Sequence, residues 1–116
     1  YSDKPDTAGS PAWKIDEYKN MVARIDRNGL QLLTHAIGDK GIRLTLDGYA
    51  HARQVNQRRD ARHRVEHIET IHPNDLPRFA QLGVIASMEP IHADPDTIHV
   101  WSERIGPERV KLAFPW

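Results

Sequence analysis

Two apolar runs of this chain each end in a histidine. The run Leu30–Asp39 carries His35 after three leucines and a threonine, and the run Arg62–Glu69 carries His67. Each run has the length of a short buried strand that leads into a turn. Active sites of α/β proteins gather at the carboxyl ends of parallel strands, and neutral imidazole binds zinc, iron and nickel. His35 and His67 are therefore candidate ligands of a divalent metal, with zinc expected first and iron or nickel as alternatives.

Helical and strand patterns alternate along the chain and must position these histidines. We expect helices over Ile15 to Asn28, about Lys40 to Val55, Pro73 to Gly83 and Asp94 to Gly106, and a short helix or turn from Pro107 through Val110. We expect strands over Leu30 to Thr34, Arg64 to Ile68 and Val84 to Met88. This order predicts an α/β fold with parallel strands, in which Leu76 and Ile98 face inward. Three strands leave two open sheet edges, so we expect more chain or a partner subunit.

Composition narrows the possible partners. The 116 residues suit one domain, and 16 basic residues balance 16 acidic ones, so we expect neither nucleic acid nor a membrane as a partner. Five arginines lie together in the sequence, and we expect a solvated loop there because no aromatic residues separate them: Arg53, Arg58, Arg59, Arg62 and Arg64. The sequence has no cysteine, so a metal must be held by histidine and carboxylate. Without a signal segment or an apolar run of about 20 residues, a cytoplasmic location is the default expectation.

Three motifs carry a resemblance to a known family. At His35–Asp39, Arg62–His67 and Met88–His92 the chain resembles the metal-dependent amidohydrolase superfamily, and within it amidohydrolase family 3, the group with the YtcJ-like enzymes. The opening Tyr1–Gly9 and the closing Ile105–Arg109 are also similar to that family. The resemblance implies part of a (β/α)8 TIM barrel, about its fifth to seventh strands with their helices. It divides the chain into a leader over residues 1–12 and a partial barrel domain over residues 13–116.

The resemblance also implies roles for individual residues. His35 corresponds to the metal ligand on the fifth strand and His67 to the ligand on the sixth. Glu89, where the family commonly has glutamine, and His92 are expected to contact substrate. Asp39 has two open interpretations: its carboxylate orients His35, or it caps the helix that begins near Lys40. Glu66 is expected to be a structural partner for an arginine.

The function implied by the resemblance is hydrolysis of a C–N bond in a small amide, formamide or cyclic amide by metal-activated water. The family's His-x-His pair, lysine and final aspartate are absent from this sequence, so we assign no catalytic base. Two histidines leave a metal underligated, and we expect this chain alone to be inactive. Because it starts at Tyr1, we expect it to belong to a longer protein, and either to form a homo-oligomer or to need the rest of the barrel. The alternative is a non-catalytic α/β module that oligomerises through its open sheet edges.

Overall fold

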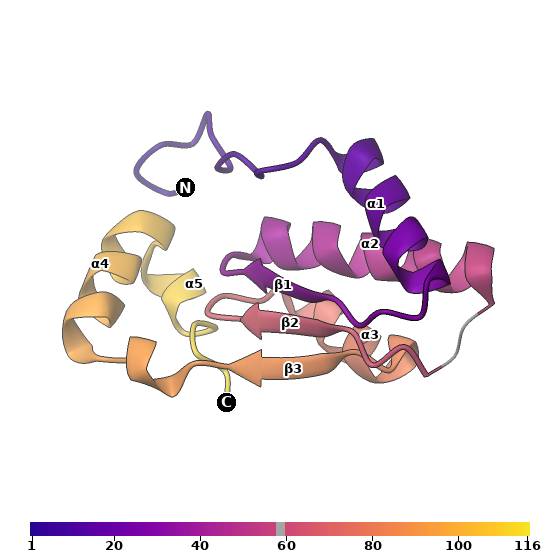
Figure 1. Ribbon diagram of the computed structural model, residues 1–116. Helices are drawn as coiled ribbons and strands as arrows, with labels where there is room; N and C mark the ends of the chain where they lie inside the picture. The colour runs from indigo at the N-terminus through magenta and orange to yellow at the C-terminus, as the bar shows by residue number, and fades with distance from the viewer. Residues whose placement is uncertain (58–59) are drawn as a thin grey trace.

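A three-stranded parallel sheet lies at the centre of the computed structural model, which describes residues 1–57 and 60–116 (Figure 1). The strands, in their order across the sheet, are β1 (Leu33–Ala36), β2 (Arg64–His67) and β3 (Ile85–Met88). Both pairings are parallel, and Val65 at the centre pairs with Thr34 and Ala86. The prediction of an α/β fold with parallel strands is confirmed.

Helices occupy the connections between the strands. They are α1 (Ile15–Arg27), α2 (Asp39–Asn56), α3 (Leu76–Leu82), α4 (Pro95–Ile105) and α5 (Pro107–Val110), with 3-10 turns η1 (Pro73–Asp75) and η2 (Pro90–His92). In Figure 1, α2 and α3 lie behind the sheet, and the carboxyl ends of the strands point towards α4 and α5. Among the described residues, none of the helices has the length and apolar character needed to cross a membrane.

The first strand differs from its prediction. β1 starts at Leu33, three residues after the expected Leu30, and continues to Ala36. The delay has a local cause: Gly29 ends α1 with φ of 78°, and the backbone N–H of Leu30 still bonds the carbonyl of Ile25 at 3.4 Å. The chain must leave this helix end before it can pair with β2, and the carbonyl of Leu32 accepts a backbone hydrogen bond from Arg64 of β2 at 2.8 Å.

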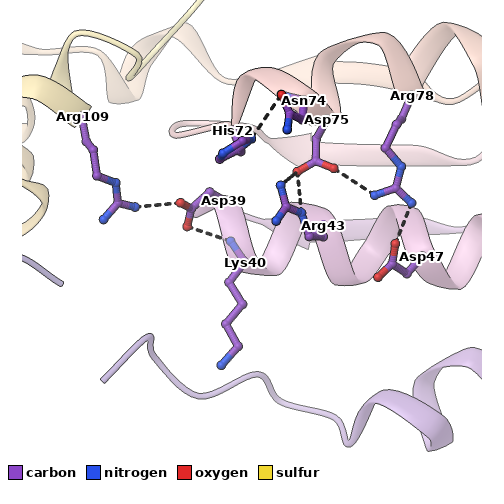
Figure 2. A network of polar contacts seen from close by, with 9 residues as sticks. All are labelled: Asp39, Lys40, Arg43, Asp47, His72, Asn74, Asp75, Arg78 and Arg109. Carbon is purple, nitrogen blue, oxygen red and sulfur yellow. Dashed lines mark hydrogen bonds and ion pairs between the residues drawn. The ribbon is translucent and has the colours of Figure 1, made fainter. Parts of the chain in front are cut away.

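Two side chains predicted to face inward are exposed. Leu76 is 51% exposed and Ile98 is 41% exposed. At the start of α3 the buried side chain is instead Asp75, which is 2% exposed. Asp75 accepts hydrogen bonds from Arg43 on α2 and from Arg78 on α3, each at 2.9 Å (Figure 2). A polar contact therefore joins α3 to α2 at this point, where the apolar pattern suggested a leucine.

The contact between α1 and α2 depends on a glycine. A Cβ atom added to Gly48 would lie 2.5 Å from Cε1 of Tyr18, closer than any ordinary carbon contact. Tyr18 is buried, and its hydroxyl lies 3.1 Å from Oγ1 of Thr34, so its ring is held in place. The absence of a side chain at Gly48 lets the two helices approach.

We therefore expect Gly48→Ala to lower the free energy of unfolding by about 1–2 kcal/mol, because overpacking outweighs alanine's better helix propensity. Urea denaturation measures the change. Gly41→Ala in the same helix is the matched control, since its Cβ would meet Ala36 at an ordinary 3.8 Å. Equal stability of the two variants would contradict this account of the helix contact.

Candidate metal centre

The two predicted ligands meet at the carboxyl end of the sheet. Nδ1 of His35, from β1, lies 2.8 Å from Nε2 of His67, at the last position of β2. Their ring centroids are 5.0 Å apart. The sequence analysis placed both imidazoles at one edge of a parallel sheet, and the structure brings them there. Their role as ligands stays a prediction.

The backbone departs from strand geometry at the end of β2, where the two imidazoles lie side by side. In the register His67 pairs with Ala36, and His35 pairs with Glu66. His67 has φ of 79° and Ile68 has φ of 57°, both in the left-handed region. That region is unfavourable for a β-branched residue such as Ile68, and strain of this kind is typical of functional sites. The regular alternation of β2 ends here, and the ring of His67 lies beside that of His35.

Glu89 completes a group of three donors. Its Oε1 lies 3.6 Å from Nε2 of His67, and one donor atom each from His35, His67 and Glu89 all fall within 4.8 Å of one another. The sequence analysis expected Glu89 to contact substrate and expected a metal to have only two ligands in this chain. Two imidazoles and one carboxylate are a donor set that catalytic zinc uses. The end of β3 supplies this third group, which the separate motifs did not reveal.

Glu69 is a site residue that the sequence analysis missed. It is buried, with 5% of its surface exposed. One carboxylate oxygen lies 2.8 Å from Nδ1 of His92 and 3.5 Å from Nδ1 of His67, and the other accepts the indole N–H of Trp101 at 3.1 Å. The available signal was its position two residues after His67, at the end of the same apolar run.

A second donor set contains Glu69. Donor atoms of His67, Glu69 and His92 lie within 4.8 Å of one another. This set contacts His67 through Nδ1, whereas the first set contacts it through Nε2. Because the two nitrogens lie on different edges of one ring, a single ion cannot use both sets.

Comparison with known proteins assigns the chain to a family. Residues 2–116 match the model of the amidohydrolase family. The chain belongs to the amidohydrolase family. The protein LONG AFTER FAR-RED 3 of Arabidopsis thaliana is 36% identical over 109 residues, which cover 94% of this chain and 18% of that protein. The putative amidohydrolase YtcJ of Bacillus subtilis (strain 168) is 25% identical over 116 residues, which cover 100% of this chain and 21% of that protein.

Solved structures of metal-dependent hydrolases support the fold. An uncharacterized metal-dependent hydrolase from Pyrococcus furiosus superposes with a TM-score of 0.74 at 30% identity, over 98% of this chain and 22% of that chain. Another from Pyrococcus horikoshii OT3 superposes with a TM-score of 0.75 at 28% identity, with the same two coverages of 98% and 22%. The expected part of an amidohydrolase barrel is confirmed. This chain spans about a fifth of the length of the relatives it matches.

Within the described part of the chain, Asp39 forms no hydrogen bond with His35 or His67. Its carboxylate accepts the backbone N–H of Lys40 at 2.8 Å and the guanidinium of Arg109 at 2.8 Å (Figure 2). The N-cap of α2 is Gly38, and no side chain caps the helix, so the interpretation of Asp39 as the helix cap is wrong. Asp39 is the first residue of α2, and its contact with Arg109 ties α5 to the start of that helix. A role in orienting His35 stays a prediction.

Glu66 has the arginine partner that was predicted. Arg64, two residues before it on β2, donates to both carboxylate oxygens at 2.9 and 3.2 Å and to Oγ of Ser87 at 2.7 Å. Burial opposes ionisation of Glu66, but hydrogen bonds with Ser87 and Arg64 outweigh it and lower the pKa of Glu66. Glu66 therefore stays ionised and paired with Arg64 near neutral pH, and its lowered pKa makes it a weak base.

The described residues include three of the five arginines of the arginine-rich segment. Arg53 donates to the carbonyl of Gln81 at 2.7 Å, and Arg64 pairs with Glu66. Arg58 and Arg59 lie outside the described residues. The expectation of a solvated loop without nucleic acid stays a prediction.

Proposed function

We propose that this chain supplies part of the metal site of a hydrolase that cleaves C–N bonds in small amides, formamides or cyclic amides. One observation carries the proposal: the donor atoms of His35, His67 and Glu89 converge at the carboxyl end of a parallel sheet. Membership of the amidohydrolase family and the metal-dependent hydrolases among its structural neighbours support it.

The donor set fits a divalent metal, with zinc as the first candidate. Nδ1 of His67 is buried and has no hydrogen-bond partner in the described part of the chain, while its Nε2 faces His35 and Glu89. Two nitrogen donors and one oxygen donor match the chemistry of zinc, and iron or nickel could also bind them. When bound, such a metal supplies Lewis-acid chemistry, which activates water and polarises an amide carbonyl.

Residues of this chain would bind the metal and contact the substrate, but they do not provide every group that the reaction needs. His35, His67 and Glu89 would hold the metal, and His92 lies beside them, 3.5 Å from Glu89, where it can contact substrate. The family's remaining ligands and its proton-accepting aspartate have no counterpart in this sequence. Activity therefore requires them from the rest of a barrel, so we propose that this chain alone is inactive.

Metal analysis and activity assays test the proposal together. We expect the protein, purified without a histidine tag, to retain about one zinc per chain by plasma mass spectrometry and to hydrolyse no amide by itself. A longer protein carrying this sequence and the missing ligands should hydrolyse amides, formamides or cyclic amides and lose that activity with a chelator. Absence of metal from both proteins, or hydrolysis that survives complete metal removal, would refute the proposal. Hydrolysis of esters but no amide would refute the C–N assignment alone.

A second candidate is a non-catalytic module that oligomerises through its sheet edges. Its support is the exposure of Leu33 on the edge strand β1 and Met88 on the edge strand β3, which are 54% and 40% exposed. Analytical ultracentrifugation separates the candidates. A stable oligomer that Leu33→Lys dissociates, together with no bound metal, favours the module.

A further inference from the structure

We propose that the cavity between the leader, α2 and α4 binds a small carboxylate that has an apolar body. The cavity has a volume of about 630 Å³, which lies within the range of small-molecule sites. In the described part of the chain, none of the candidate metal donors His35, His67 and Glu89 lines it. The cavity is therefore a second ligand site, and the proposal does not depend on the proposed function.

Most of the surface inside the cavity is apolar. The apolar side chains come from α4, from α2 and from the turn after β1: Trp101, Ile105, Leu44 and Ile37. Residues 8–11 of the leader form another side. The backbone N–H of Ser2 donates to the carbonyl of Arg104 at 2.7 Å, which holds the leader against the end of α4. An apolar ligand body gains free energy by leaving water for this space.

Lys40 brings a positive charge to the cavity. It lines the cavity from the first turn of α2, and Figure 2 shows its side chain extending away from the helix. Among the described residues, no carboxylate forms an ion pair with Lys40, whereas Arg43 is paired with Asp75. Arg109 is likewise paired with Asp39, the one carboxylate among the described lining residues. The uncompensated charge lies at the positive end of the α2 dipole and favours a ligand with one negative charge.

Two further hydrogen-bond donors line the cavity. Nδ1 of His72 accepts the backbone N–H of Asn74 at 3.2 Å, so the neutral ring carries its proton on Nε2. Thr70 is 3% exposed, and its hydroxyl has no hydrogen-bond partner in residues 1–57 and 60–116. A buried hydroxyl without a partner is rare in folded proteins, and an acceptor on a bound ligand would satisfy it. Unpaired donors and a paired carboxylate favour an anion over an amine.

Titration with phenylbutanoate, followed by 1H–15N NMR of the backbone and indole N–H groups, tests the proposal. We expect saturable shifts at Gly41 and at the Trp101 indole, with a Kd below about 1 mM. Phenylbutanol has the same apolar body without the charge, and it should bind about fivefold more weakly, the ratio for the loss of one exposed ion pair. Equal binding of the alcohol, no saturation, or shifts centred on His35 and His67 would overturn the proposal.

Lys40→Gln tests the source of the charge preference. It should weaken phenylbutanoate binding by about fivefold and leave phenylbutanol binding unchanged. The control is Lys14→Gln, because the side chain of Lys14 is 86% exposed and does not line the cavity. Both lysines are exposed, so both variants should keep the fold. Unchanged phenylbutanoate affinity in Lys40→Gln would overturn the proposal.

The site must also be open in a longer protein, because this chain spans about a fifth of the length of its relatives. The same titration of a longer protein that carries this sequence should give the same affinity and the same effect of Lys40→Gln. Loss of binding there would mean that the additional chain fills the cavity, and it would reject the ligand site. A failure of zinc binding would leave this result unaffected.

Discussion

Replacing His67 with alanine is expected to weaken zinc binding by more than about 100-fold, beyond the range for residues that only orient a ligand. His67 contributes to both donor sets of the site, through Nε2 to His35 and Glu89 and through Nδ1 to Glu69. Both candidate donor sets found among the described residues include His67. Isothermal titration calorimetry with zinc gives the affinity and the stoichiometry.

His35→Ala identifies the donor set that holds the ion. It removes a donor from the set with Glu89 and leaves the set of His67, Glu69 and His92 intact. We expect a loss similar to that of His67→Ala, because the proposed metal site uses His35. His99→Ala is the control, since its side chain is 76% exposed on α4. Unchanged zinc affinity in His35→Ala would move the site to the second set, and unchanged affinity in His67→Ala would exclude both.

Asp75→Ala is expected to lower the free energy of unfolding by about 3 kcal/mol, the lower end of the range for breaking a buried ion pair. The side chain of Asp75 is 3% exposed and joins Arg43 of α2 to Arg78 of α3 (Figure 2). Both arginines are partly exposed and can return to water, which limits the loss. Urea denaturation at pH 7 measures it.

The exposed end of the same network is the control. Asp47 accepts from Arg78 at 2.6 Å, but its side chain is 38% exposed. Asp47→Ala should therefore cost no more than about 1 kcal/mol, as for other solvent-exposed ion pairs. Similar losses for the two variants would contradict the importance of burial at Asp75.

The stabilisation from Asp75 should depend on pH. Burial opposes its ionisation, but hydrogen bonds from Arg43 and Arg78 outweigh that cost and lower the pKa of Asp75 below its ordinary value. A lowered pKa means that the folded state favours the charged form, so the stabilisation is complete above about pH 4, the unfolded value, and is lost as pH falls through the folded pKa. The difference in stability from Asp75→Ala should therefore shrink below about pH 4.

Some features of the site were predictable from strand patterns and from the parallel order of the strands. The apolar runs that end in His35 and His67 became neighbouring parallel strands, and the two imidazoles meet 2.8 Å apart. Glu66 pairs with Arg64, which lies two residues away on the same strand, as predicted. Strand periodicity is recorded in the pattern of side chains, and the carboxyl ends of parallel strands meet at one edge of the sheet.

Other features depend on register and on backbone geometry between distant segments. A contact of Glu89 with substrate stays a prediction, but the pairing of His67 with Met88 places the end of β3 beside the histidines. Glu69 was missed because its partners, His92 on η2 and Trp101 on α4, come from elements outside the sheet. No periodicity of the sequence records such a contact.

The sequence by itself determined the alternating elements, the two strand-ending histidines and the family resemblance, because short-range spacing and motifs carry that information. Only the tertiary structure decided which carboxylates accompany those histidines and which nitrogen of each ring they face. The left-handed backbone at His67 and Ile68 interrupts the strand alternation that sequence periodicity assumes. Side-chain contacts with His67 and Glu69 then bring Glu89, His92 and Trp101 to the site.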